Sequence, residues 1–204
     1  IAEAVQNGHL FCAAAGNSAS NNDTLPHYPS NYDLPSIISV AASNSSDKLA
    51  WFSCYGLKTV DLAAPGEGIL SLVPNGGTAT YSGTSMATPH VAGAAALLLS
   101  INSDYGHQEL KNALMNSVDV ISAFEGKMVA PGRLNLANAV GEAKPGWLTV
   151  TPDAGTVTAG SQEDLIFSAD ASEFNAGIKS AVAVFETNDP LATVIEVPVE
   201  LTVT

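Results

Sequence analysis

The sequence contains few basic residues. Seven Lys and Arg stand against twenty Asp and Glu in 204 residues, so the formal net charge is −13. A surface of that sign repels nucleic-acid phosphates and anionic lipid headgroups. We therefore expect no nucleic acid and no membrane among the partners of this protein.

Cysteine is scarce, and long hydrophobic runs are lacking. Cys12 and Cys54 are the two cysteines, and both lie in apolar, strand-like runs where a thiol packs as a small hydrophobic group. We favour two free buried thiols over one disulfide. The longest apolar stretch, VAGAAALLLSI, is too short to cross a bilayer.

Charged residues make up 13% of the chain and hydrophobic residues 46%. This composition excludes an extended disordered chain, because it provides enough apolar surface for a packed core. The chain begins without a methionine, and its first residues, IAEAVQNGHL, resemble the middle of a helix. We therefore expect the sequence to be a piece of a longer protein.

Residues 1–143 alternate between strand-like and helix-like segments. The runs HLFCAAAG, SIISVAAS and TVDLAAPG are short and apolar, as is typical of strands buried on both faces of a parallel sheet. Helices are predicted over residues 90–101, 107–117 and 135–142, the first apolar nearly all round and therefore buried. This alternation predicts an α/β domain.

The composition changes after residue 143. Residues 147–204 are rich in Thr and Val and contain alternating segments such as SAVAVFET and VIEVPVELTVT. Segments of this kind, separated by turn signals, predict a small antiparallel β-sandwich. Residues 144–146 would form the linker between the two domains.

The run YSGTSMATPHVAG, residues 81–93, holds the first candidate for chemistry. Gly83 permits a tight turn, and Ser85 then lies at the start of the apolar helix. At a helix N-terminus, free N–H groups and the positive end of the helix dipole stabilise developing negative charge. From these residues alone, Ser85 is either a helix cap or an exposed nucleophile.

A second candidate lies in the run AAAGNS. Gly16 and Asn17 follow a buried strand, and α/β folds place ligands beyond the carboxyl ends of their strands. The Asn17 amide could donate a hydrogen bond to an oxyanion, or the pair could form an ordinary turn.

Together, AAAGNS and SGTSMATPHVAG, with YPSNY, ISVAAS and VDLAAPG between them in order, resemble the subtilisin-like serine proteases, the subtilases. The resemblance covers residues 1–143 and ends with PGRLNLANAV, which is similar to the family's closing segment. It implies the C-terminal half of a subtilisin-like doubly wound parallel sheet, with Ser85 as nucleophile and Asn17 as oxyanion-hole amide. Residues 147–204 resemble the small Ig-like modules appended to secreted bacterial proteases.

The other two members of the catalytic triad are missing from the sequence. The family uses Asp, His and Ser in that order, but no Asp or His before Ser85 stands in the family's Asp-Thr-Gly or His-Gly-Thr context. His90 follows Ser85 on the same helix and points away from it. We expect this chain to be inactive alone, with the missing N-terminal half of the protease domain as the partner that supplies the Asp and the His.

The resemblance also implies a substrate pocket with walls of small residues, which leave room for a sizeable apolar P1 side chain. His27 would lie near the pocket floor, where it could admit polar or acidic groups, or it could be an ordinary loop histidine. The residues that would contact substrate are Ala13, Ala14, Ala15, Gly16, His27 and Thr84.

A cation site is a further hypothesis from the resemblance. Asp61, with the backbone carbonyls of Ser30 and Tyr32, resembles the family's weaker metal position. One carboxylate and two carbonyls are fewer than the six to eight oxygens that calcium prefers, so water would have to complete the shell. We expect no required cofactor, with a structural calcium as an open alternative.

The leading hypothesis is part of a secreted bacterial endopeptidase that hydrolyses peptide bonds through an acyl-enzyme on Ser85, with peptides or proteins as substrates. The alternative is a catalytically incompetent protease scaffold that serves in binding or adhesion through its β-domain. The intact pair of Ser85 and Asn17 favours the enzyme.

Overall fold

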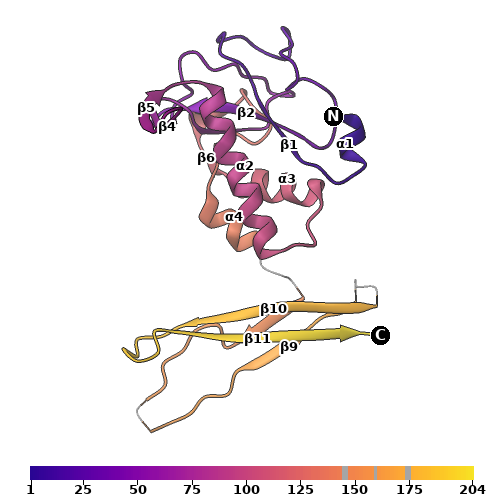
Figure 1. The fold of residues 1–204 in the computed structure, drawn as a ribbon, viewed down its shortest axis with the longest axis vertical. Helices are drawn as coiled ribbons and strands as arrows, with labels where there is room; N and C mark the ends of the chain where they lie inside the picture. The colour runs from indigo at the N-terminus through magenta and orange to yellow at the C-terminus, as the bar shows by residue number, and fades with distance from the viewer. Residues whose placement is uncertain (144–146, 159, 173–175) are drawn as a thin grey trace. The chain divides into compact units, whose positions relative to one another are not determined.

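A computed structural model describes residues 1–143, 147–158, 160–172 and 176–204. The chain folds into two compact units, Ile1–Lys144 and Pro145–Thr204 (Figure 1). The predicted linker at 144–146 lies outside the described residues.

The first unit is built on a five-stranded sheet with the order β1-β2-β3-β7-β6. The pairs β1–β2, β2–β3 and β3–β7 are parallel, and β6 is antiparallel to β7. The sheet is therefore mixed and mostly parallel, and the α/β class and the three strands predicted from the apolar runs are confirmed. Its strands are β1 (Phe11–Ala14), β2 (Ile37–Ser43), β3 (Leu62–Pro65), β6 (Asp119–Val120) and β7 (Gly132–Arg133).

Successive residues of the central strands enter two different cores. Ile38, Val40 and Ala42 of β2 pack in the first core, and Ala41 between them packs in the second. Every residue of β2 is buried. This alternation is the strand period of two, with apolar side chains on both faces.

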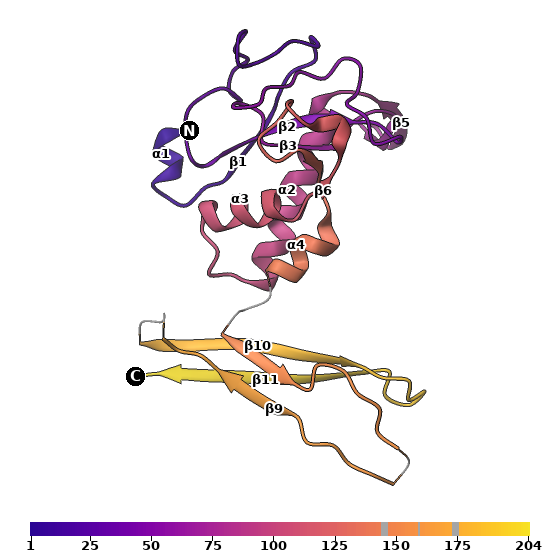
Figure 2. The same ribbon diagram turned by 180° about the vertical axis from the view of Figure 1, so that it is seen from behind.

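The two faces of the sheet are covered differently. α2 contacts β1, β2 and β3, and α3 and α4 pack against α2 (Figures 1 and 2). The second core instead contains Phe124 and Met128 together with loop residues such as Cys54 and Val60. The helical elements are α1 (Ala2–Val5), α2 (Thr84–Ile101), α3 (His107–Asn116), the 3₁₀ turn η1 (Ser122–Phe124) and α4 (Leu136–Glu142).

In this part of the predicted doubly wound sheet, the described α-helices that pack on the strands cover one face. None of the described α-helical residues belongs to the second core, because the connections after β1 and β2 run as loops over that face.

α2 begins at Thr84, so the prediction that Ser85 lies at the start of the apolar helix is confirmed, and the helix includes six residues before the predicted span 90–101. It is buried on one side through residues such as Val91 and Leu98, whereas Leu97 and Leu99 are 39% and 38% exposed. The prediction that this helix is buried all round is therefore wrong. By length and mean hydropathy α2 could cross a bilayer, but the core helix of a soluble protein meets the same criteria.

β1 lies at the edge of the sheet. Its neighbour β2 is reached through hydrogen bonds such as those from the Phe11 N–H to Ser36 O and from the Ala15 N–H to Val40 O. Because successive peptide groups point to opposite sides of a strand, the backbone groups of Cys12 and Ala14 face away from β2. No described strand pairs with β1 on that side.

A β-hairpin before α2 was missed by the sequence analysis. It consists of β4 (Ile69–Val73) and β5 (Gly77–Tyr81), which pair antiparallel. Its turn contains Asn75 and Gly76 in the left-handed region, with φ of 70° and 80°. An Asn-Gly pair between strand-like runs is the local signal that would have revealed it.

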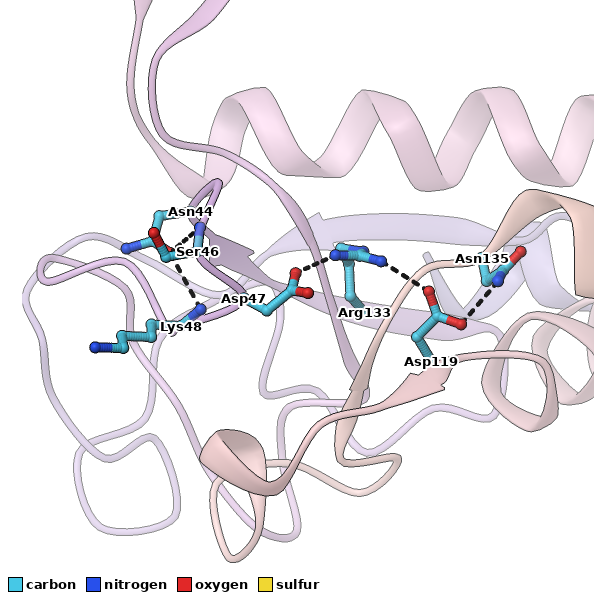
Figure 3. A network of polar contacts seen from close by, with 7 residues as sticks. All are labelled: Asn44, Ser46, Asp47, Lys48, Asp119, Arg133 and Asn135. Atoms are coloured by element: carbon cyan, nitrogen blue, oxygen red, sulfur yellow. Dashed lines mark hydrogen bonds and ion pairs between the residues drawn. The ribbon is translucent and has the colours of Figure 1, made fainter.

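A polar network ties the end of β2 to the β6–β7 pair (Figure 3). The Arg133 guanidinium binds the carboxylates of Asp47 and, at 2.7 Å, Asp119. Asn135 donates a further hydrogen bond of 2.8 Å to Asp119. The hydrogen bonds from Asn135 and Arg133 lower the pKa of Asp119, so this carboxylate stays charged in mildly acidic solution.

The second unit contains two antiparallel strand pairs, and none of the described strand residues in it is fully buried. Phe167 and Phe185 meet edge to face, with ring centroids 6.4 Å apart, beside an open groove of about 830 Å³. The antiparallel pairing agrees with the prediction, but the two pairs do not enclose a sandwich core. The strands are β8 (Leu148–Thr151), β9 (Ile166–Ala169), β10 (Gly177–Glu186) and β11 (Val194–Val203).

Candidate active site

The carboxyl end of β1 and the N-terminus of α2 are joined by a hydrogen-bonded clamp. The Thr84 N–H and hydroxyl both donate to Asn17 Oδ1, at 2.9 and 3.0 Å. The Gly16 N–H donates to Thr84 Oγ1 at 3.2 Å. Thr84 is completely buried, so these bonds are shielded from competing water.

The clamp fixes the orientation of the Asn17 amide. Because its oxygen accepts both bonds from Thr84, its Nδ2 donor is turned the other way, toward Gly83. Nδ2 lies 3.5 Å from the place where a Cβ on Gly83 would stand. It makes no hydrogen bond to any other described residue, so it is available to an acceptor.

Ser85 is the second residue of α2, and its side chain is exposed. The N–H groups of Met86 and Ala87 both bond to Gly83 O, whereas the Ser85 N–H has no partner among the described residues. The Ser85 hydroxyl is thus accompanied by a free N–H at a helix N-terminus, where negative charge is favoured. The site therefore offers a hydroxyl and two free N–H donors.

Gly16 is required by the shape of the loop that carries Asn17. Its φ is +110°, a conformation that side chains rarely adopt. A Cβ at this position would lie 2.9 Å from His27 Cδ2 and 3.1 Å from Cys54 Sγ. The imidazole of His27 therefore packs directly against the loop that carries Asn17, although the residue is exposed to solvent.

Cys54 lies beneath the same loop as a free, fully buried thiol. Burial alone would raise its pKa, but hydrogen bonds with the Ser18 and Ser20 hydroxyls outweigh that effect and lower it. Burial raises the pKa of Cys12, the other free thiol, to about 11. The prediction of two free thiols is confirmed, with Cys12 only partly buried.

The residues of the predicted substrate pocket differ in how far their side chains are exposed. The side chains of Ala13 and Ala15 are 3% and 0% exposed, so they pack within the protein. Thr84 is equally inaccessible, and its hydroxyl positions Asn17. Ala14 is half-buried, and with His27 it remains accessible at this end of β1.

Asp61, the carboxylate of the hypothetical cation site, has a structural role. Its Oδ1 pairs with Lys111 Nζ at 2.9 Å, and its Oδ2 accepts the Ser39 N–H at 2.7 Å. Ser30 donates its hydroxyl to His27 O, and Tyr32 is exposed. Both Asp61 oxygens are thus engaged by N–H donors, and no described group of three His, Cys, Asp or Glu could hold a metal ion.

The described residues supply no base to Ser85, whose hydroxyl forms no hydrogen bond with any of them. His90 Nδ1 lies 2.9 Å from Met86 O of its own helix. The described residues thus place an exposed hydroxyl near free N–H donors, without a proton acceptor that would activate the hydroxyl.

Asn22 is a supporting residue that the sequence analysis missed. It is fully buried, and its Nδ2 donates to Ala15 O at 2.8 Å, which holds the chain just before Gly16. Because Asn22 lies in the polar run SASNNDT, the sequence predicts an ordinary loop residue at this position. The burial of one Asn in such a run is set by tertiary contacts and has no local signal.

A helix-borne serine beside a clamped amide donor and a free backbone N–H is the arrangement of an acyl-transferring serine hydrolase. The sequence profile of the Subtilase family matches residues 1–163. The chain belongs to this family of serine peptidases.

Individual relatives show the same likeness. The chain is 42% identical over 130 residues to subtilisin NAT of Bacillus subtilis subsp. natto, covering 62% of this chain and 33% of that protein. It is 43% identical over 133 residues to thermitase of Thermoactinomyces vulgaris, covering 65% of this chain and 44% of thermitase. The chain therefore spans less than half the length of these relatives.

A solved structure of the prenylagaramide maturation protease PagA has a similar fold. It matches with a TM-score of 0.59 and 34% identity over 69% of this chain and 52% of that one.

Proposed function

We propose that the chain is the C-terminal part of the catalytic domain of a secreted subtilisin-like endopeptidase, with Ser85 as its nucleophile. The observation that carries the proposal is the clamp from Thr84, which leaves Asn17 Nδ2 and the Ser85 N–H as two free donors beside the Ser85 hydroxyl. Family membership supports peptide bonds as the substrate.

In the proposed reaction, Ser85 Oγ attacks the carbonyl carbon of the scissile bond while its proton passes to a histidine outside this sequence. The carbonyl oxygen becomes an oxyanion that accepts hydrogen bonds from Asn17 Nδ2 and the Ser85 N–H. The C–N bond then breaks, the amine takes the proton from the histidine, and an acyl ester remains on Ser85. Water hydrolyses this ester by the same sequence of steps.

The histidine and its orienting aspartate would come from the missing N-terminal half. Two features of the first unit fit a further layer of protein: the open edge of β1 and the exposed apolar side of α2 at Leu97 and Leu99. Unpaired strand edges and apolar helix faces are stable when another segment covers them.

The position of His27 bears on substrate preference. Its imidazole packs against Gly16, next to the oxyanion donor, and its side chain remains exposed. We propose that His27 contacts the substrate side chain before the scissile bond and admits polar or acidic groups there. The half-buried Ala14 would form the apolar part of the same wall.

Phosphonylation of the full-length protein with a serine-directed reagent tests the nucleophile. We expect mass spectrometry to find the label on Ser85, and to find it unchanged in the variant Ser100→Ala, which alters an exposed serine on the same helix. Absence of label on Ser85 would favour the alternative, a protease scaffold without activity that binds partners through residues 147–204.

Complementation tests the missing half. Residues 1–204 alone should hydrolyse no activated ester, and addition of the N-terminal half in trans should restore hydrolysis. Ester hydrolysis by residues 1–204 alone, lost in Ser85→Ala, would overturn the half-site proposal. The upstream coding sequence gives an independent check, since an Asp-Thr-Gly and a His-Gly-Thr should stand there.

A further inference from the structure

The two outer edges of the β10–β11 pair are built differently. Both strands are ten residues long and are paired along their whole length. Val182 lies opposite Pro198 in this register. Proline has no N–H, so the pair of Val182 and Pro198 must be one that exchanges no hydrogen bonds across the ladder.

This register fixes which backbone groups point outward. In an antiparallel pair, positions that exchange hydrogen bonds alternate with positions whose N–H and C=O face away. The even-numbered residues of both strands therefore direct their backbone groups to the outer edges. In β10 the outward N–H groups are those of Ile178, Ser180, Val182, Val184 and Glu186. None of these N–H groups has a described partner.

The edge of β11 carries features that discourage further pairing. Pro198 removes the N–H at its centre, and Glu196 and Glu200 flank it. Proline and charged side chains on an edge are the usual protection against strand addition.

The edge of β10 lacks these features. Its outward positions carry one charge, at the end, on Glu186, and Ile178, Val182 and Val184 are 64%, 56% and 56% exposed. A long, regular and apolar open edge is a template for another strand. The edge of β11 is therefore protected against strand addition, whereas the edge of β10 can pair with a further strand.

We propose that β10 pairs antiparallel with β10 of a second copy of this chain, which joins two strand pairs into one four-stranded sheet. A two-fold axis at Val182 places Val182 against its own copy, Ser180 against Val184 and Ile178 against Glu186. No like charges lie opposite each other in this register, which allows all the outward groups of β10 to pair. Because Pro198 closes the other edge, assembly stops at the dimer and does not continue into a fibre.

Self-pairing also supplies what the isolated strand pair lacks. Two-stranded sheets are at best marginally stable in water, and three or more strands with an apolar face are needed for independent stability. In the dimer the exposed Val182 contacts its own copy and the exposed Val184 lies opposite Ser180 of the second copy, so both valines lose exposed surface. This inference is independent of the peptidase proposal, because no residue in it belongs to the candidate active site.

The mass of the full chain in solution, measured by sedimentation equilibrium over a range of concentrations, tests the dimer. Val182→Lys places like charges opposite each other on the axis and should weaken association by roughly tenfold or more. Val182→Pro removes one outward N–H and leaves the internal ladder intact, so it should also give monomers. Val194→Lys is the matched control, since Val194 is similarly exposed at 52% but lies on the edge of β11.

The register has its own test. Ser180→Lys and Val184→Glu should each weaken the dimer, and their combination should restore it, because the new charges would lie opposite each other across the axis. Circular dichroism spectra like that of the parent chain would show that the variants remain folded. A chain that stays monomeric at all concentrations, or a dimer that persists in folded Val182→Lys, would overturn the proposal.

Discussion

The two units of the chain differ in how their strands are covered. Every residue of β2 is buried between a helical layer and a layer of loops, whereas no described residue of β10 is buried. Both strands are rich in small and β-branched residues, so composition does not account for the difference. Strand burial depends on the layers that the rest of the chain supplies, and the second unit has few residues for that purpose.

The difference extends to the polar groups. In the first unit, hydrogen bonds to the buried Thr84 hold Asn17 in a single orientation. In the second unit, the outward N–H groups of β10 have no described partner. A chemical site needs the first kind of environment, because its donors must be held in place before the reaction begins.

The strongest test of this comparison removes the nucleophile from the well-packed unit. Ser85→Ala in the full-length enzyme should abolish peptidase activity, a loss of about 10⁶ in kcat of the size known for a subtilisin. The fold should persist, because Ser85 is exposed. Deletion of residues 147–204 is the contrasting variant and should leave ester hydrolysis intact, and loss of hydrolysis there would place part of the site in the second unit.

The next largest effect is expected at the oxyanion donor. Asn17→Ala should lower kcat by about 10²–10³ with little change in KM, since the amide acts mainly on the transition state; this magnitude itself comes from a subtilisin. Thr84→Val should give a smaller loss because one of its two bonds to Asn17 remains, and Thr84→Ser should restore activity. Equal effects on kcat and 1/KM would instead indicate a role for Asn17 in ground-state binding.

Core substitutions compare the packing of the units directly. Leu98→Ala should destabilise the first unit by about 2–5 kcal/mol, because Leu98 is fully buried. Phe167→Ala should cost less than about 2 kcal/mol, because Phe167 is 36% exposed and lies beside an open groove. Chemical denaturation, monitored by hydrogen exchange in each unit, measures the loss of unfolding free energy in both variants. Equal losses would contradict the difference in packing between the two units.

The smallest effect concerns pH. The folded state raises the pKa of Cys12 from 9.0 to about 11, so the thiol ionises first in the unfolded chain and stability should fall as pH rises through this interval. Cys12→Ala should remove this part of the slope. Cys54→Ala should have the opposite effect, because its folded pKa is lowered. Urea midpoints between pH 9.0 and about 11 test Cys12→Ala, and midpoints below pH 9.0 test Cys54→Ala.

Much of the first unit could be predicted because its signals are local. The apolar runs at β1, β2 and β3 and the motif around Ser85 are readable without tertiary information. The burial of Thr84 and the pairing of Asp61 with Lys111 could not be predicted in this way, because each depends on a segment far away in the chain. In the second unit, alternation gave the strands, but it could not show whether a second layer closes over them.

The clamp between Asn17 and Thr84 also has a consequence for the order of folding. Its two bonds join residues 67 positions apart, so they form only after a long loop has closed and α2 has docked on the sheet. Before that moment the Asn17 amide can rotate, and its donor has no fixed direction. The Asn17 donor therefore takes its fixed position late in the folding of the first unit, and a partly folded chain contains Ser85 without this donor held near it.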